Sequence, residues 1–231
     1  MKMELKNIVK SYGELEIFKD FSISFISGSI NCILGPSGCG KTTLLNIMNG
    51  SVLPGSGNRG DFSKLCFSYV FQEPRLLPWK TVKENIAFVL KERMSDDSLQ
   101  QRLDEYLTLV QLEKFSDYYP SRLSGGMKQR VSLARAFSYD SDIILMDEPF
   151  KALDYKLKNN LIEQFVNLWE KDKRTVIFVT HDVDEVLQIG HQMFLFSNPP
   201  VKVIEQFFIP VNQEKKDLLR NRLLAKLEAQ E

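Results

Sequence analysis

Residues 29–48 read SINCIL, GPSGCGKT and TLLNIM in succession, and this stretch decides the fold. The first block is short, apolar and β-branched, which is typical of a buried strand. The last block has the composition of a helix. Between them, residues 35–42 match the pattern G-x-x-x-x-G-K-[ST], which requires a strand before it and a helix after it. The stretch predicts a phosphate-binding loop in an α/β fold; a Gly-rich turn without a ligand is the alternative.

The loop has the residue types that polyphosphate binding needs. Its glycines allow several backbone N–H groups to converge on phosphate at the positive end of the helix that follows. Lys41 is expected to reach the β- and γ-phosphates, and the Thr42 hydroxyl to ligate Mg²⁺. The residues expected to bind nucleotide here are Gly35, Pro36, Ser37, Gly38, Cys39, Gly40, Lys41, Thr42 and Thr43.

Cys39 lies inside the loop, where the field that attracts phosphate should also favour a thiolate. On that basis, alkylation of Cys39 is expected to block nucleotide binding, and ATP to protect the thiol. The alternative is that Cys39 is an inert small residue that fills space.

Composition excludes several classes of protein. The chain has 231 residues, 43% of them hydrophobic, which suits one large folded domain. Its formal net charge is zero, so nothing favours sequence-independent nucleic-acid binding. The longest apolar run, residues 86–90, is far shorter than the roughly 20 residues of a membrane span. Three cysteines without a CxxC pair, and no visible secretory signal, predict a reduced, cytoplasmic setting.

The remaining apolar blocks surround a helical segment. Thr81 and Glu84 form a capping box, and a second helical pattern begins at Ser95, so residues 81–140 are expected to be helical. A terminal amphipathic helix docked on the core is expected from residue 213 onward. The predicted architecture is a mostly parallel α/β core with an inserted helical subdomain at 81–140. Further strands are expected at 21–25, 65–71, 143–147, 175–180, 193–196 and 201–208.

Two carboxylates end the apolar run at residues 143–148. They should emerge at the carboxyl end of a buried strand, where α/β sheets bind ligands. Asp147 is the natural partner of Mg²⁺, through water, and Glu148 can polarise an attacking water as general base. The alternative is that both acids cap the strand or pair with lysines.

Residues 123–130 read LSGGMKQR and precede a predicted helix at 131–137. A Ser-Gly-Gly turn that opens a helix exposes N–H groups and a serine hydroxyl, which makes a second anion site. One chain therefore carries two phosphate-binding devices but only one lysine-bearing loop.

The motifs together resemble the ATP-binding subunit of an ABC transporter, from about residue 1 to at least residue 200. The resemblance implies a P-loop NTPase (RecA-like) core with an antiparallel β part and an inserted α-helical subdomain, within a single ABC ATPase domain at 1–231. The motifs that carry it, in the family's order, are Tyr12, the loop at 35–43, Gln72, LSGGMKQR at 123–130, LMDEP at 145–149, Ala152-Leu153-Asp154 and His181.

The resemblance also implies roles for single residues. Tyr12 stacks on adenine, although an ordinary half-exposed strand aromatic is the alternative for this residue alone. Gln72 senses Mg²⁺ and the lytic water, and His181 contacts the γ-phosphate. Two subunits pack head to tail, and three residues of one subunit close over the ATP of the other. These three are Ser124, Gly125 and Gly126. Lys151 departs from the family, because many relatives have a small residue there.

Within the family, the chain resembles the nitrate/sulfonate/taurine branch of bacterial importers. That branch implies membrane permease subunits, a second ATP-binding subunit (a homodimer is expected), an extracytoplasmic binding protein and a place on the cytoplasmic side of the membrane. The alternatives are an exporter subunit, a DNA-associated or translation ATPase, and a nucleotide-binding module without turnover. A groove for a short permease helix is expected, or else plain core, at Phe71, Leu76, Leu77 and Trp79.

Overall fold

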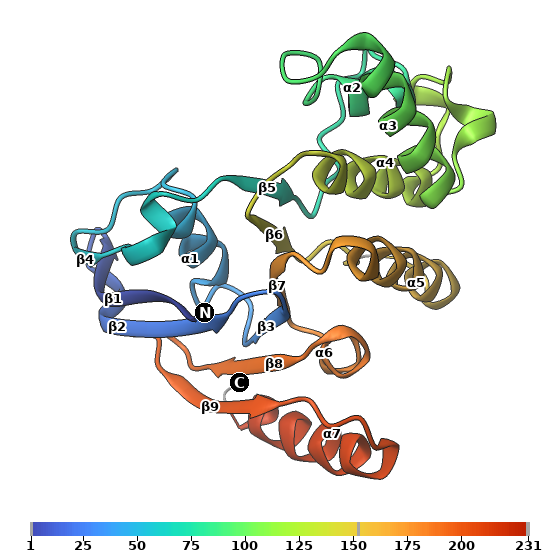
Figure 1. Cartoon of the computed structure of the whole chain (residues 1–231). Helices are drawn as coiled ribbons and strands as arrows, with labels where there is room; N and C mark the ends of the chain where they lie inside the picture. The colour runs from blue at the N-terminus through green and yellow to red at the C-terminus, as the bar shows by residue number, and fades with distance from the viewer. Residues whose placement is uncertain (1, 152, 230–231) are drawn as a thin grey trace. The chain divides into compact units, whose positions relative to one another are not determined.

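A computed structural model describes residues 2–151 and 153–229 of the chain (Figure 1). The described residues form two compact units. The first comprises the chain up to Phe67 and again from Arg174 onward, and the second comprises Ser68–Lys173. Ala152, one of the residues that carry the family resemblance, lies outside the described residues.

The first unit contains seven complete strands and three helices among its described residues. Its strands are β1 (Lys2–Tyr12), β2 (Leu15–Ile26), β3 (Ile30–Leu34), β4 (Ser56–Asn58), β7 (Thr175–Thr180), β8 (Gln192–Phe196) and β9 (Val203–Phe208), with the first residue of β5 (Phe67–Val70) at its boundary. Its helices are α1 (Lys41–Met48), α6 (Val183–Ile189) and α7 (Gln213–Glu228), and one 3₁₀ turn spans Gly60–Ser63.

Strand β3 lies between two parallel neighbours. It pairs with β7, where Ile30 is opposite Val176, and with β8, where Asn31 is opposite Gln192. Strand β9 runs antiparallel to β8, and β1 pairs antiparallel with β2 on one side and β4 on the other. All five residues of β3 are buried, as expected for a strand with neighbours on both sides. The parallel core and the antiparallel part are therefore both confirmed.

The predicted strands agree with the structure apart from their ends. The strand predicted at 201–208 begins only at Val203, because the turn before it has its own hydrogen bonds. There the Ser197 N–H donates to the Lys202 carbonyl at 3.0 Å, and the Lys202 N–H donates to the Ser197 hydroxyl at 2.8 Å. Local hydrogen bonds of the turn have overridden the apolar pattern at this point.

Phenylalanines from β2 and β8 form the core between the two β layers of the first unit. Phe21 meets Phe196 edge to face, with ring centroids 5.5 Å apart, and Phe25 meets Phe194 at 5.3 Å. The period-two pattern at residues 21–25 produces this arrangement, because alternate side chains of a strand point to one face. Such aromatic pairs add stabilisation beyond the area they bury.

The C-terminal helix α7 packs on α6 and β9, as expected for a docked terminal helix (Figure 1). Leu219 and Leu223 are its buried residues. Arg222 and Lys226 both pair with Glu205 of β9, and Lys216 Nζ donates to the Leu187 carbonyl at 2.7 Å. The helix is therefore held by a narrow apolar stripe with ionic contacts beside it.

Asn31 is a fully buried amide in the middle of the β3 strand. Its Nδ2 donates to the Ile26 carbonyl at 3.0 Å, and its Oδ1 accepts from the Ile26 N–H at 3.0 Å. The side chain thus satisfies both backbone groups where β2 ends and the chain turns into β3. Burial without these partners would be costly.

Replacing this amide by an apolar side chain should destabilise the fold. In Asn31→Leu the Ile26 N–H loses its acceptor, and the free energy of unfolding should fall by about 2 kcal/mol. Urea denaturation of the purified chain measures the change. The control is Asn221→Leu, at an exposed position of α7, which should stay within about 0.5 kcal/mol of the parent. Equal effects of the two substitutions would contradict this account of Asn31.

The second unit is mainly helical, with two short strands. It contains the remainder of β5 (Phe67–Val70) beside β6 (Ile143–Asp147), together with the helices α2 (Val82–Ala87), α3 (Asp96–Leu109), α4 (Gly125–Ser138) and α5 (Tyr155–Asp172) and the 3₁₀ turns η2 (Glu113–Phe115) and η3 (Pro120–Arg122). Residues 81–140 lie within this unit, which extends beyond them on both sides.

Local signals determine where these helices begin. The Thr81 hydroxyl accepts from the Glu84 N–H, and the Glu84 carboxylate accepts from the Thr81 N–H at 2.7 Å, so the predicted capping box is present at the start of α2. Helices α4 and α5 pack through Phe137 and Phe165, whose ring centroids are 5.9 Å apart.

Among the described residues, no helix has the length and apolar character needed to cross a membrane.

Candidate functional site

The phosphate loop follows β3 and leads directly into α1. Gly40, immediately before the helix, has φ +114°, and a Cβ there would lie 2.6 Å from Ile17 Cγ2. Gly35 has a different reason to be glycine, because a Cβ there would lie 3.0 Å from Phe196 Cβ. Backbone conformation thus requires glycine at the end of the loop, and close packing requires it at the start.

Lys41 lies in this loop, and its side chain is only 4% exposed. Its ammonium donates to the carbonyls of Gly35 and Pro36, each at 2.7 Å. Two of its three N–H donors thus hold the cation against backbone carbonyls of the loop. This arrangement brings positive charge and N–H donors together at a helix N-terminus, which fits a polyphosphate.

Tyr12 and His181 are the other predicted site residues of the first unit. Tyr12 ends β1 with its side chain half exposed, and Lys10 Nζ lies 5.1 Å from its ring centroid. An exposed aromatic face is suited to stacking on a base. His181 is exposed and follows β7 directly. The turn that holds His181 is anchored by the buried Thr180 hydroxyl, which donates to Glu185 Oε2 at 2.7 Å.

His191, to which the sequence assigned no role, belongs to the framework of the first unit. Its Nδ1 accepts from the Ile30 N–H at 3.3 Å, and its own N–H donates to the Ile30 carbonyl at 2.9 Å. These bonds join the start of β3 to the residue before β8. His191 therefore supports the strand that leads into the phosphate loop.

The cysteines differ in access. Cys39 is 1% exposed, and its Sγ lies 3.3 Å from the position of a Cβ on Gly35. Cys32 is fully buried, and burial raises the pKa of its thiol. Cys66 is partly exposed. Modification of Cys39 therefore requires the loop to open, and this burial favours the alternative in which Cys39 is a small residue that fills space.

We expect one fast thiol in the native chain. At pH 8 a small aromatic disulfide reagent should modify Cys66 first and reach Cys32 and Cys39 only slowly, because thiolate fraction and access control the rate. In denaturant all three cysteines should react together. Cys66→Ser is the control and should remove the fast phase. A fast phase that survives this substitution would show that the loop admits reagent to Cys39.

Asp147 and Glu148 stand at the end of β6, as the sequence predicted. Residues 143–146 are fully buried, whereas Asp147 and Glu148 are partly exposed. Glu148 has φ +45°, so the strand ends there and the chain turns sharply. Tyr69 of β5 donates its hydroxyl to Asp147 Oδ2 at 3.3 Å. Burial, and next the charge of Asp147, raises the pKa of Tyr69, which keeps this donor protonated.

Gln72 is exposed and lies in the irregular segment after β5. A stack of side chains holds the residues around it. The ring centroids of Tyr69 and Phe71 are 4.1 Å apart, and Arg75 Cζ lies 3.9 Å from the Phe71 centroid. Arg135 of α4 donates to the carbonyls of Pro74 and Arg75, each at 3.1 Å. The segment after Gln72 is therefore fixed to the helix that the signature residues begin.

Asn85 of α2 fixes the next part of the same segment. It is fully buried, accepts from the Leu77 N–H at 2.8 Å and donates to the carbonyls of Leu77 and Lys80. Leu76 and Leu77 are half buried, whereas Trp79 is 69% exposed. The four residues considered for a groove therefore differ in environment, and Phe71 belongs to the ring stack.

The signature residues open helix α4. The Ser124 hydroxyl accepts from the Met127 N–H at 3.3 Å and caps the helix. Gly125 has open space where a Cβ would lie. A Cβ on Gly126 would instead lie 2.4 Å from Leu157 Cδ1 of α5. The first glycine is thus exposed at a helix N-terminus, and the second is needed for helix packing.

The predicted site residues divide between the two units. The first unit holds Tyr12, the phosphate loop with Lys41 and Thr42, and His181, and the second holds Gln72, Ser124, Gly125, Gly126, Asp147 and Glu148. Each unit presents its residues at strand ends or helix starts. Residues 2–151 and 153–229 hold no group of three or more His, Cys, Asp or Glu side chains suited to a metal ion. Mg²⁺ does not need one, because it is usually held by one or two protein oxygens and by phosphates.

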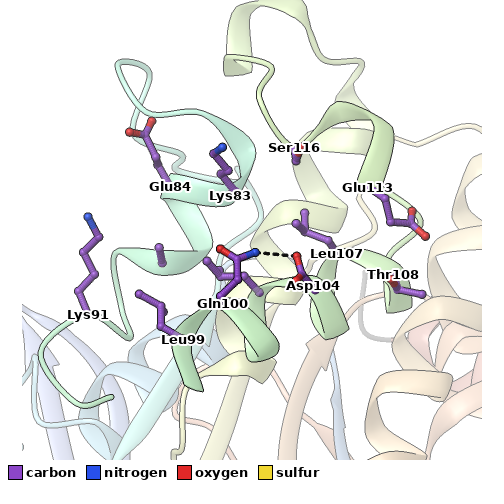
Figure 2. A pocket seen from close by; sticks show the side chains of 12 residues that line it. Lys83, Glu84, Lys91, Leu99, Gln100, Asp104, Leu107, Thr108, Glu113 and Ser116 are labelled. Carbon is purple, nitrogen blue, oxygen red and sulfur yellow. Dashed lines mark hydrogen bonds between the residues drawn. The ribbon is translucent and has the colours of Figure 1, made fainter. Parts of the chain in front are cut away.

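A pocket of about 540 Å³ lies within the second unit (Figure 2). Its apolar part comes from α2 and α3, where Ala87, Leu99, Leu103 and Leu107 line it. Charged side chains surround these residues, and Gln100 Nε2 donates to Asp104 Oδ1 at 2.8 Å along one wall (Figure 2). None of the four residues considered for a groove lines this pocket.

The fold and the loop define an ABC-type nucleotide-binding protein, and the comparisons agree. The sequence model of the ABC transporter family matches residues 18–151, so the chain belongs to this family. The predicted α/β P-loop fold is confirmed by the same family and by solved cassettes. The chain is an ATP-binding, ATP-hydrolysing subunit of the ABC type.

Individual relatives are similar over most of the chain. It is 36% identical over 231 residues to the aliphatic sulfonates import ATP-binding protein SsuB of Bacillus anthracis, covering 95% of this chain and 91% of that protein. It is 38% identical over 224 residues to the sulfate/thiosulfate import ATP-binding protein CysA of Pectobacterium atrosepticum, covering 91% of this chain and 67% of that protein.

Solved structures give the same fold. The dimeric structure of MJ0796, described as a bacterial ABC transporter cassette, superimposes with a TM-score of 0.77 at 31% identity, covering 92% of this chain and all of that one. A dimeric post-hydrolysis state of MJ0796 bound to ADP and Pi gives a TM-score of 0.74 at 30% identity, with the same coverage.

Three contributions to the site were missed from the sequence. Tyr69 and Arg135 act through contacts that no local pattern reveals, because their partners are 78 and 60 positions away, whereas Asn85 bonds Leu77 only 8 positions away. Only Asn85 left a signal, as a polar residue followed at once by the apolar run 86–90.

Proposed function

We propose that this chain is the ATP-hydrolysing subunit of an ABC importer of the nitrate/sulfonate/taurine kind. The observation that carries the proposal is the phosphate loop, in which Lys41 is held by two carbonyls beside a Gly40 of positive φ. The relatives named above are import ATP-binding proteins for sulfonates and for sulfate or thiosulfate. Oxyanion import is therefore the reaction that this chain would energise.

ATP is proposed to bind with its phosphates in the loop and its adenine on Tyr12. Lys41 would contact the β- and γ-phosphates, and Thr42, Gln72 and Asp147 would provide oxygen ligands for Mg²⁺, directly or through water. When bound, Mg²⁺ neutralises charge that develops on the phosphates. The nucleotide-binding residues are proposed to be Tyr12, Gly35, Pro36, Ser37, Gly38, Cys39, Gly40, Lys41, Thr42 and Thr43.

Hydrolysis is proposed to use Glu148 as general base. The Glu148 carboxylate takes a proton from water, the water oxygen bonds to the γ-phosphorus, and the bond from that phosphorus to the ADP oxygen breaks. Gln72 positions the water, and His181 and Lys41 donate to the γ-phosphate as negative charge shifts.

The signature residues are proposed to act on a second subunit. Ser124, Gly125 and Gly126 present donors at the start of α4, and a head-to-tail dimer would place them on the partner's γ-phosphate. Closure around two ATP molecules would exclude water from both sites. The dimeric MJ0796 cassettes support a dimer.

Coupling to membrane permease subunits is proposed to run through the helical subdomain at 81–140. The pocket between α2 and α3 has an apolar floor and a charged rim, which suits a short amphipathic helix (Figure 2). The exposed Trp79 is a further contact candidate. The chain would then sit on the cytoplasmic side of the membrane as a peripheral subunit, fed indirectly by an extracytoplasmic binding protein.

Removing the proposed base should separate ATP binding from turnover. In Glu148→Gln we expect ATP affinity to persist and hydrolysis to fall by about 10²-fold or more, because a general base contributes roughly 10²–10⁴-fold. The trapped ATP should also hold the variant as a stable dimer, which size-exclusion chromatography detects. Phosphate release and nucleotide-binding fluorescence measure the two properties.

The matched control is Glu163→Gln, an exposed acid on α5 of the same unit, which should behave as the parent. Turnover that persists in Glu148→Gln would exclude Glu148 as the base. A variant that stays monomeric with saturating ATP would count against the head-to-tail dimer.

The docking surface can be tested without touching the nucleotide. Leu99→Asp puts a charge on the apolar floor of the pocket and should reduce co-purification with the co-expressed permease at least tenfold. Burying one unpaired charge costs about 1.4 kcal/mol or more, and 1.4 kcal/mol corresponds to a tenfold change in affinity. ATP turnover of the isolated subunit should not change. Leu218→Asp on α7, an exposed leucine, is the control. Equal retention of the permease by both variants would place its docking surface elsewhere.

A further inference from the structure

Lys151 makes a direct ion pair with Glu148. Its Nζ lies 2.7 Å from Glu148 Oε2, within the distance of a charge-assisted hydrogen bond. The Glu148 side chain is 11% exposed and that of Lys151 is 37% exposed. The Glu148 side chain is therefore largely removed from water.

The turn after β6 creates this pair. Glu148 has φ +45°, and the Lys151 N–H donates to the Glu148 carbonyl at 3.2 Å. The backbone thus closes a tight turn that brings the side chains at positions 148 and 151 together. A small residue at position 151 would form the same turn without placing a cation on the carboxylate.

The pair affects the proposed chemistry through competition. A general base must direct a carboxylate lone pair at its water, within about 2.6–3.2 Å of the water oxygen. The Lys151 ammonium already pairs with one oxygen of this carboxylate. Water must therefore approach the other oxygen or displace the ammonium.

We propose that Lys151 is a positioning residue that restrains turnover, because it ties the Glu148 carboxylate to its own turn and competes with the attacking water. This inference rests on the proposed role of Glu148 as general base. Lys151 is not among the residues proposed above to bind nucleotide. Turnover by the subunit is then limited by how often Glu148 is released from this ion pair.

The test compares Lys151→Met, which keeps the stem and removes the charge, with Lys151→Arg, which keeps a cation. In Lys151→Met the kcat for ATP should rise about two- to tenfold, as expected for loss of one partly exposed ion pair, with KM unchanged within about twofold. Lys151→Arg should stay within about twofold of the parent. Lys156→Met, an exposed lysine on α5, is the charge-matched control and should leave kcat unchanged.

A second measurement tests the pair without any turnover. Thermal unfolding of the nucleotide-free chain is compared for Lys151→Met, Glu148→Gln and the double variant. The shifts in Tm should be non-additive, because the second substitution finds the pair already broken. Additive shifts would show that the two side chains are not coupled in the protein and would overturn the proposal.

The kinetic outcomes are equally decisive. A kcat that is unchanged or lower in Lys151→Met, or one that rises equally in Lys151→Arg, would overturn the inference and leave the general base intact. Failure of the proposed function looks different, since parent and Glu148→Gln would then turn over ATP at the same rate.

Discussion

The turn between β3 and α1 is the constraint on which the site depends. A chain leaving a buried parallel strand must reverse into a helix within six residues, and it does so with glycine where φ is positive and where Phe196 approaches the backbone. The positive end of α1 and the Lys41 ammonium are thereby brought to one place. Any side chain at Gly40 would collide with Ile17 of β2, so the loop also depends on the antiparallel layer.

The second unit holds a segment of irregular backbone in a defined conformation. The segment after Gln72 has little regular structure, and several of its backbone groups are hydrogen-bonded by Asn85 and Arg135. Burial lowers the pKa of the Arg135 guanidinium, as expected for a cation surrounded by protein. Long polar side chains from α2 and α4 thus replace the hydrogen bonds that a strand or helix would provide.

Much of the fold could be predicted from local sequence, because its strands are short, apolar and bounded by clear turns. The capping box at Thr81 and the strand at 175–180 are found where the pattern placed them. The missed contacts are those in which one partner is distant, such as Tyr69 with Asp147. The ion pair of Lys151 with Glu148 joins residues only three positions apart, yet it depends on the positive φ of Glu148, and no residue pattern predicts that conformation for a glutamate.

The two signature glycines have unequal surroundings, and this affects how alanine scanning of the motif should be interpreted. A methyl group on Gly126 would clash with Leu157, so a loss of activity in Gly126→Ala would combine a helix-packing defect with a changed nucleotide contact. A methyl group on Gly125 enters open space and leaves the α4–α5 packing alone. Gly125 is therefore the cleaner reporter of what the start of α4 touches, and a smaller side chain at position 157 is the natural suppressor of a defect at Gly126.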